Sequence, residues 1–527
     1  MSPTFSIVTP VYDPDPQVWN ACVASVRGQL DPDWEWIVVN DGGRDADIRA
    51  ALTALSEAEP RVRFIDRSEQ RGIVAATNAG LKEARGEFVC FLDHDDELHP
   101  EALRSVRQHS RGDDVDLLYS DEVVIDDDGA IIDPLYKPGW SPERLLAHNY
   151  VNHLVAVRRS LLEDIGRLRE GFDGSQDHDL VLRASERART IAHLPYPLYR
   201  WRMSRGSVLS GGLDSKPYAW ENGRRAVQEH CDRAGIAATV GELVIPGVAR
   251  WYRVDRQLPD DASTALVVPI VAGHAESEQA ERLAEGVLDS VRAAGHEQLE
   301  VVVAFGADVP DDFAERFKAV AEHATRVVRS TRHSRWAAVA NTAAMRSDAG
   351  FLLFLDPAAR VTDHGWVATL VSVAAGERIG AVGARLVRPG DIIEQAGYGL
   401  VGGEPWHLLR GLPTTTTAYG GAALVPGERS AVTGRCMAVA RSRFEQVGGF
   451  SPTYAAAYHD VDLCLKLRMA GYRNVYEPAV SAQWLDVALP AGREDDLARL
   501  RQRWDDELRN DPYVNPGLIG AEWLTHR

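Results

Sequence analysis

One stretch of the sequence recurs in the second half of the chain, and this repeat constrains the fold more than any other feature. Residues 78–88 align with residues 341–351, and the same offset carries Asp93 onto Asp356. Farther along, the segments 35–39, 171–172 and 176–180 correspond to the segments 300–303, 449–450 and 459–463. Such self-similarity is typical of a structural unit duplicated in tandem. The repeat therefore predicts two homologous domains that meet near residues 258–261.

The chain is long enough for these two domains and a further segment. Its 527 residues correspond to about two to four domains of ~100–200 residues each. A hydrophobic fraction of 45% and a charged fraction of 26% exclude a disordered or collagen-like chain. We expect a first domain over residues 1–257, a second over residues 262–490 and a helical tail over residues 491–527.

Short apolar runs alternate with helical patterns through the first domain. Strands are predicted at residues 5–8, 35–39, 62–65 and 88–92, and helices at residues 17–28 and 73–84. This alternation indicates an α/β fold with a mostly parallel sheet covered by helices on both faces. Ligands of such sheets bind at the carboxyl ends of the strands. Two of these ends carry acidic turns, at Asp41 and at residues 93–96.

The charge and composition of the chain restrict the classes of partner that it can bind and the cellular compartment in which we expect it. Acidic residues outnumber basic ones by 77 to 58, which argues against nucleic acid as a partner because phosphate backbones require clustered cations. The five cysteines are scattered and form no CxxC pair, so they are predicted to be buried thiols. Neither a signal peptide nor a run of ~18 apolar residues is visible. We therefore expect a soluble cytoplasmic protein, and peripheral association with the inner face of the membrane stays open.

Two carboxylates with a spacing of two follow the strand predicted at residues 88–92. Asp93 and Asp95 leave a buried strand into a loop, where both side chains can reach one hard cation. Mg²⁺ and Mn²⁺ bind few protein carboxylates and complete their coordination with water and phosphate oxygens. Such an ion stabilises a departing diphosphate. The alternative is an acidic turn that faces solvent without a metal.

Three further residues each have a chemical and a structural interpretation. Asp177 can serve as general base for an acceptor hydroxyl, or a carboxylate here can cap the helix that begins beside it. Asp41 can accept from a nucleobase or a ribose hydroxyl, or it can form a turn with Gly42 and Gly43. Arg71 can contact a phosphate or a base, or it can be a loop charge.

Arginines gather around a tryptophan after the apolar segment 194–199. Arg200, Trp201 and Arg202 combine guanidinium groups, which suit a diphosphate, with an aromatic ring, which suits the face of a sugar or a base. Surface salt bridges would account for the same arginines equally well.

Taken in order, these motifs resemble glycosyltransferase family two, whose members have the GT-A fold. The resemblance covers nearly the whole chain and follows a tandem two-domain pattern of bacterial cell-surface polysaccharide biosynthesis. Its carriers are residues 7–12, 39–42, 91–97, 119–122, 137–142, 174–180 and 199–202, continued by residues 432–434, 448–450, 460–463 and 511–513. The resemblance implies two tandem GT-A domains, each with a Rossmann-like, mostly parallel mixed sheet, and a C-terminal helical tail.

The resemblance also implies roles for individual residues of the first domain. Asp177 falls on the residue that acts as base in inverting members, and Asp93 and Asp95 look like the metal-binding DxD motif. The donor would be bound by Thr9, Pro10, Tyr12, Asp41, Arg71, Asp93, Arg200, Trp201 and Arg202. The candidates for contact with the acceptor are Trp140, His153 and Gln176.

One departure from the family pattern concerns the metal. Relatives of this tandem type often carry histidines around Trp201, but Arg200 and Ser204 stand at those positions here. The resemblance therefore identifies no third protein ligand beside Asp93 and Asp95.

A second departure concerns the second domain. Pro357 and Ala358 replace His94 and Asp95, and a glycine near position 306 replaces Asp41. The remaining carboxylate, Asp356, is a poor Mg²⁺ site by itself. Two acids of this domain persist, at positions 460 and 462, which leaves an acceptor-binding, a structural or a helix-capping role open. We expect the second domain to be inactive or altered in mechanism.

The predicted function is an inverting, metal-dependent transfer of a sugar from a nucleotide-diphospho-sugar to a hydroxyl group. UDP or dTDP is the expected nucleotide, Mg²⁺ or Mn²⁺ the cofactor, and a cell-surface glycan or lipid-linked molecule the acceptor. The alternatives are a degenerate pair that serves as a glycan-binding or scaffold subunit, and a bifunctional transferase that uses both halves. A nucleotidyltransferase would need a glycine-rich basic loop after the first strand, and residues 9–13 are not one.

Overall fold

The computed structural model divides the chain into two compact units. It describes residues 3–112, 114–203, 217–245, 249–275, 280–317, 325–331, 334–485, 493–519 and 524–525. Unit 1 comprises residues 1–140, 145–254 and 515–517, and unit 2 comprises residues 141–144, 255–514 and 518–527.

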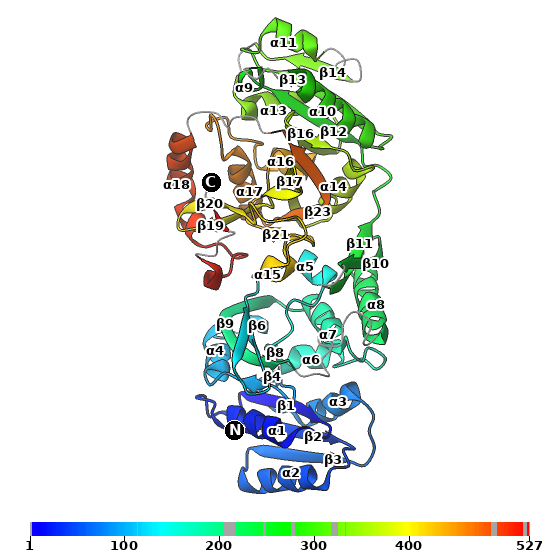
Figure 1. Ribbon diagram of the computed structural model, residues 1–527, viewed down its shortest axis with the longest axis vertical. Helices are drawn as coiled ribbons and strands as arrows, with labels where there is room; N and C mark the ends of the chain where they lie inside the picture. Colours follow the sequence, from blue (N-terminus) through cyan, green and yellow to red (C-terminus); the bar gives the residue numbers. More distant parts are fainter. Residues whose placement is uncertain are drawn as a thin grey trace. The chain divides into compact units, whose positions relative to one another are not determined.

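Unit 1 is built on one large mixed sheet (Figure 1). Its strands are β1 (Phe5–Val11), β2 (Trp34–Asp41), β3 (Val62–Arg67), β4 (Phe88–Phe91), β5 (Glu97–Leu98), β6 (Val115–Ile125), β7 (Ile131–Leu135), β8 (Val155–Arg158) and β9 (Thr190–Arg202). Its helices are α1 (Pro16–Arg27), α2 (Ala46–Ala58), α3 (Ile73–Glu83), α4 (Ala102–His109), α6 (Arg159–Ile165), α7 (Gln176–Ser185) and α8 (Pro217–Arg233). Three elements remain: α5 (Pro142–Ala147) and the two-stranded sheet of β10 (Ala238–Ile245) and β11 (Ala249–Arg256).

The strand order of the unit 1 sheet is β3-β2-β1-β4-β8-β6-β9-β5, with β7 paired to β6. The first four strands are mutually parallel, whereas β8 runs antiparallel between β4 and β6. The sheet is therefore parallel where the chain alternates strand and helix and mixed beyond that point. Because β1, β2 and β4 are parallel, the turns that follow them leave the sheet at the same edge.

Helices cover both faces of this sheet, as the alternation of side chains along β1 illustrates. Ile7 packs into a cluster with residues of α1, α2 and α4, and its neighbour Val8 packs into another with α3, α6 and α7. Gly80 of α3 lies so close to β1 that an added Cβ would be 2.7 Å from the Val8 side chain. The two faces thus carry separate hydrophobic cores, as in other doubly wound sheets.

Unit 2 repeats this arrangement. Its large sheet contains β12 (Thr264–Ile270), β13 (Leu299–Phe305), β14 (Arg326–Arg329), β15 (Phe351–Leu355), β16 (Ala359–Val361), β17 (Ile379–Arg388), β18 (Ile392–Gln395), β21 (Gly427–Arg429), β22 (Cys436–Ala440) and β23 (Arg473–Trp484). A smaller sheet contains β19 (Tyr398–Val401), β20 (Glu404–Leu408) and β24 (Leu524–Thr525). The helices are α9 (Ala272–Ala275), α10 (Ala280–Ala293), α11 (Asp311–Arg316), α13 (Trp336–Ala344), α14 (Trp366–Ala374), α15 (Ala418–Gly421), α16 (Arg441–Gln446), α17 (His459–Met469), α18 (Arg493–Arg509) and the 3₁₀ turn η1 (Pro516–Leu518).

The large sheet of unit 2 has the order β14-β13-β12-β15-β22-β17-β23-β16, which matches unit 1 strand for strand. The predicted fold class is confirmed: two tandem GT-A domains with mixed, largely parallel sheets and a helical tail. The alignment of the repeat needs one correction. Asn78 holds the backbone of Leu168, and its counterpart Asn341 holds Phe450 in the same way, so Phe450 corresponds to Leu168 rather than to Phe172.

The tail helix α18 is part of the unit 2 core. Leu500, Trp504 and Leu508 are buried in the same cluster as the strands β12 and β15. The indole of Trp504 donates to the buried carboxylate of Asp462, 2.9 Å away. Helix α18 therefore completes unit 2 instead of forming a separate layer.

Candidate active site

The acidic turn after β4 is held in place by a tyrosine of β9. The Tyr199 hydroxyl donates to Asp96 Oδ2 at 2.7 Å and accepts from the backbone N–H of Asp93 at 3.2 Å. The other oxygen of Asp96 accepts from the backbone N–H of Arg202 at 2.7 Å. Asp96 therefore fixes the turn, whereas the carboxylates of Asp93 and Asp95 accept no hydrogen bond from the described residues.

The turn carries negative charge that the protein does not neutralise. Burial, and then the neighbouring charges of Asp95 and Asp177, raise the pKa of Asp93 to about 7. Burial and the charges of Asp95 and Asp93 also raise the pKa of Asp96. Within the described chain, no lysine or arginine forms an ion pair with Asp93, Asp95 or Asp177. An uncompensated acidic cluster of this kind is typical of a site that receives a cation.

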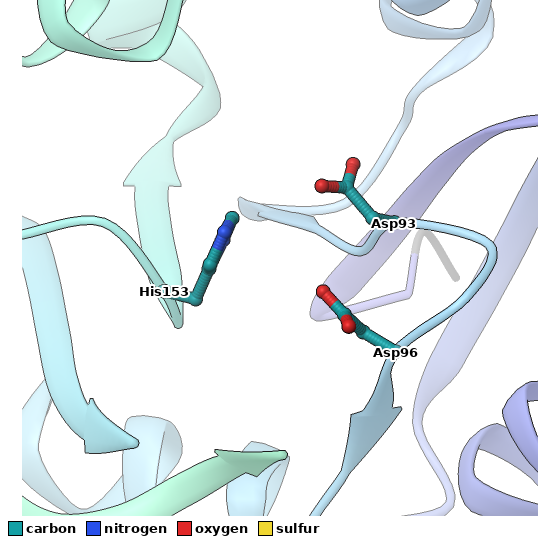
Figure 2. A group of neighbouring side chains, drawn as sticks. All are labelled: Asp93, Asp96 and His153. Atoms are coloured by element: carbon teal, nitrogen blue, oxygen red, sulfur yellow. The ribbon is translucent and has the colours of Figure 1, made fainter. Parts of the chain in front are cut away.

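A histidine that precedes β8, the strand paired with β4, lies close to this turn. One ligand atom each of Asp93, Asp96 and His153 lies within 4.8 Å of the others, and Figure 2 shows the imidazole opposite the two carboxylates. Burial, together with the charge of Lys137, lowers the pKa of His153 to about 3, so the ring is neutral. The imidazole stacks on Tyr199 with ring centroids 4.6 Å apart. The resemblance implies a contact between His153 and the acceptor, whereas the structure puts the His153 ring beside Asp93, one of the two predicted metal ligands. Ser204, the other position at which relatives carry a histidine near Trp201, lies outside the described residues.

Asp177 approaches the same turn from the start of helix α7. It is the second residue of the helix, and it is close enough to Asp93 to affect the pKa of that carboxyl group. The side-chain amide of Asn149 donates to Asp177 Oδ2 at 2.9 Å. In the described chain, Asp177 Oδ1 has no hydrogen-bond partner. The neighbouring Gln176 instead accepts from the backbone N–H of Gly174.

The predicted nucleotide residues lie at the ends of β1 and β2. The buried Asp41 forms an ion pair with Arg67 at 2.7 Å and accepts from the backbone N–H groups of Arg71 and Gly72. Asp41 thus organises the loop that carries Arg71. The hydroxyl of the fully buried Thr9 accepts from the indole of Trp36 at 2.9 Å, so this side chain supports the sheet.

Two other residues expected at the nucleotide lie beside the acidic turn or at the surface. The Pro10 carbonyl is 3.2 Å from His94 Nδ1, which links the end of β1 to the turn. Tyr12 is 43% exposed and available to a ligand.

The arginines of β9 are engaged by the protein itself. Arg202 is buried and donates to Glu97 and to the backbone carbonyls of residues 95, 126 and 127. Arg200 donates to the Gly129 carbonyl at 2.6 Å and pairs with Glu97 at 3.3 Å. This geometry favours a structural role for Arg202 over the donor contact we expected. Trp201, between them, is half-buried.

The remaining acceptor candidate, Trp140, lies at the end of unit 1 against the edge of Tyr119, with ring centroids 6.4 Å apart. Sequence reasoning identified Asp93, Asp95 and Asp177 but missed Tyr199 and Asn149. Tyr199 stands directly before the motif at residues 200–202, although no pattern in the sequence indicates that its hydroxyl reaches Asp96.

The equivalent turn of unit 2 has a different electrostatic balance. His274 Nε2 lies 3.3 Å from Asp356 Oδ1, and Arg435 Nη1 lies 3.8 Å from Oδ2. Burial alone would raise the pKa of Asp356, but the charges of His274 and Arg435 outweigh it and lower the pKa to about 2. Both carboxylate oxygens of Asp460 accept hydrogen bonds, from the N–H groups of Val461 and Gly434 and from Tyr398.

The sheet of unit 1 and the acidic turn at its carboxyl edge agree with a domain of the GT-A type. Residues 6–166 match the family model described as Glycosyl transferase family 2. This part of unit 1 belongs to the family, which confirms the resemblance seen in its motifs.

Several bacterial proteins are similar to this chain. The O-antigen biosynthesis protein RfbC of Myxococcus xanthus is 34% identical over 98% of this chain and 40% of its own length. An uncharacterized protein of Sinorhizobium fredii is 31% identical over 98% of this chain and 58% of its own length. A chondroitin synthase of Escherichia coli is 30% identical over 44% of this chain and 33% of its own length. The chain thus spans about half the length of the first two relatives.

Among solved structures, the S. aureus TarS 1-349 complex with UDP-GlcNAc is 20% identical, with a TM-score of 0.36. The match covers 43% of this chain and 66% of that one. In the part of the present chain that is described, no helix is long and apolar enough to cross a membrane.

Proposed function

We propose that unit 1 transfers a sugar, with inversion, from a nucleotide-diphospho-sugar to an acceptor hydroxyl in the synthesis of a cell-surface polysaccharide. The observation that carries this proposal is the proximity of three carboxylates, Asp93, Asp95 and Asp177, at the carboxyl edge of the sheet, none of which forms an ion pair with a described lysine or arginine. Two of them suit a metal-bound diphosphate, and the third suits a proton-transfer step.

The residues of the turn fit a divalent cation. Their charge is uncompensated, as the raised pKa of Asp93 indicates, and hard oxygen ligands are the preferred donors for Mg²⁺ and Mn²⁺. We propose that Asp93 and Asp95 hold this ion and that His153 stands within reach as a neutral ligand. When bound, the ion would supply electrostatic stabilisation to the departing diphosphate.

Asp177 is proposed as the general base. Asn149 holds one carboxylate oxygen at 2.9 Å, which orients Oδ1 toward an acceptor hydroxyl. Asp177 would take the hydroxyl proton while the acceptor oxygen forms a bond to the anomeric carbon and the bond to the nucleoside diphosphate breaks. One such displacement inverts the configuration at the anomeric carbon.

The donor and acceptor are proposed from the residues around this centre. Tyr12, Pro10 and the loop of Arg71 would contact a UDP or dTDP nucleotide, and Arg200 with Trp201 would flank its phosphates or sugar. Thr9, Asp41 and Arg202 would support these groups through the contacts described above. The acceptor would meet Asp177 near Gln176 and Trp140. A lipid-linked acceptor would place the protein at the cytoplasmic face of the membrane.

A scaffold or glycan-binding subunit is the rival function, and donor binding distinguishes the two. We expect one or more UDP- or dTDP-sugars to raise the melting temperature in the presence of Mg²⁺ or Mn²⁺, because a ligand of the native state stabilises it. Asp95→Ala should abolish the shift, whereas Asp164→Ala, an exposed acid of α6, should retain it. A panel in which no donor produces a metal-dependent shift would favour the scaffold.

A further inference from the structure

An arginine of unit 2 occupies the place that His153 takes in unit 1. In unit 1, β4 and β8 pair antiparallel, and one step beyond Leu92 and Leu154 the register sets Asp93 opposite His153. In unit 2, β15 and β22 pair with Leu355 opposite Cys436, and the next step sets Asp356 opposite Arg435. The backbone N–H of Asp356 donates to the Arg435 carbonyl at 2.8 Å, in keeping with this register.

The Arg435 guanidinium is held in position by an aromatic ring, and its N–H groups are available to a ligand. It lies over the Trp484 ring, 4.0 Å from the ring centroid, and its nearest counter-charge, Asp356 Oδ2, is 3.8 Å away. Among the described residues, no acceptor forms a hydrogen bond with the guanidinium, and the Arg435 side chain is 29% exposed. A planar guanidinium with available N–H groups can donate two parallel hydrogen bonds to a pair of oxygen atoms of a phosphate group.

The region around Arg435 combines several arginines with the acids Asp356 and Asp460, and it contains two histidines whose ring atoms lack hydrogen-bond partners in the described chain. His459 stacks on Trp336 at 4.6 Å, and its ring has no hydrogen-bond partner in the described chain. The buried Nδ1 atom of His407 is likewise without a partner there. Burial and then the charges of Arg410, Arg493, Arg435 and Arg388 lower the pKa of His407 to about 3. The four arginine charges that reach His407 favour the binding of an anion in this part of unit 2.

We propose that unit 2 binds a phosphate-bearing ligand at Arg435 without a metal ion. The fixed guanidinium would supply the positive charge that a divalent cation is proposed to supply in unit 1, and Trp484 would hold the guanidinium plane. The phosphate group could belong to a nucleoside diphosphate or to the diphosphate of a lipid-linked glycan. The proposal concerns unit 2 alone and does not depend on transfer in unit 1.

Calorimetric titration of the full chain with inorganic pyrophosphate in EDTA tests this site, because the chelator removes any metal-dependent binding in unit 1. We expect saturable binding that weakens by about tenfold or more in Arg435→Gln. Arg378→Gln, an exposed arginine on a turn of the same unit, should bind as the wild type does. A wild type that does not bind, or an Arg435→Gln variant that binds unchanged, would overturn the proposal.

A second variant separates binding from folding, since Arg435→Gln also removes the partner of Asp356. Asp356→Asn releases Arg435 from its counter-charge and should tighten pyrophosphate binding severalfold. Weaker pyrophosphate binding in Asp356→Asn, with an intact melting transition, would contradict the proposal that the Arg435 guanidinium binds the phosphate group. Titrations with UDP and with a short-chain prenyl diphosphate, both in EDTA, then identify which source of the diphosphate the site prefers.

Discussion

Asp93 and Asp356 follow equivalent strands of the two units, yet their surroundings shift the pKa values of the two carboxyl groups in opposite directions. Burial and neighbouring acids raise the pKa of Asp93 to about 7, whereas His274 and Arg435 lower that of Asp356 to about 2. Unit 1 leaves its negative charge for a ligand to neutralise, and unit 2 neutralises the charge internally. The same sheet can therefore carry either an unneutralised acidic site or a neutralised one. A few residues at one edge of the sheet determine which of the two is present.

The acids at the start of the equivalent helices differ in a similar way. One oxygen of Asp177 accepts no hydrogen bond from the described residues, whereas both oxygens of Asp460 accept hydrogen bonds from neighbouring groups. Two residues farther along, Asp179 and Asp462 are both fully buried and paired with cations. The structural acid is thus common to both units, and the chemically available one is found in unit 1.

The largest expected effect is the loss of transfer when the proposed base, Asp177, is replaced, and it tests the difference between the two units directly. Asp177→Asn should lower transfer by about 10²–10⁴-fold, because the amide cannot take the acceptor proton. Asp460→Asn should change transfer by less than about threefold. Activity measured with a donor identified by thermal shift tests both variants, and full turnover by Asp177→Asn would remove Asp177 from the mechanism. Loss of transfer in Asp460→Asn, with the fold intact, would give unit 2 a part in catalysis.

The next effect tests what the two units share. Asp179 pairs with Arg183 at 2.9 Å, and Asp462 pairs with Lys466 at 3.3 Å and Arg503 at 3.0 Å. Removing either acid leaves a largely buried cation, Arg183 or Lys466, without its counter-charge, so Asp179→Ala and Asp462→Ala should each cost about 3–5 kcal/mol. Urea unfolding followed by hydrogen exchange would assign each loss to its own unit. A loss below about 1 kcal/mol in either variant would show that its ion pairs are dispensable.

A smaller effect should have opposite signs in the two units. In EDTA at pH 7.5, Asp93→Asn removes a carboxylate whose charged form is disfavoured by burial and by the neighbouring acids, and it should stabilise unit 1 by about 1–2 kcal/mol. Asp356→Asn removes the partner of His274 and Arg435 and should destabilise unit 2 by a similar amount. Changes of the same sign in both variants would contradict the electrostatic contrast drawn above.

The smallest effect concerns pH. Because the pKa of Asp356 is lowered from 3.8 to about 2, its stabilising contribution is present above pH ~4 and is lost as the pH falls toward 2. The difference in unfolding free energy between wild type and Asp356→Asn should therefore be larger at pH 5.5 than at pH 3. Urea titrations at the two pH values measure it, and a difference that grows on acidification would reverse the assigned sign.

Much of the fold and part of the site followed from local patterns. The strands and helices expected in residues 5–92 appear within a few residues of their predicted bounds, because apolar alternation and turn residues act over short distances. The acidic turn was recognisable from the spacing of Asp93 and Asp95 after an apolar strand. The expectation that all five cysteines are buried and unpaired is confirmed.

The repeat and its substitutions predict, from the sequence alone, a duplicated α/β fold whose halves differ in acidic residues. Three contacts become visible in the folded chain instead: Tyr199 with Asp96, His153 with Asp93 and Arg435 with Asp356. The residues of each contact lie far apart in the chain, so strand register rather than local sequence brings them together. The antiparallel pairings of β5 with β9, of β4 with β8 and of β15 with β22 set these three contacts.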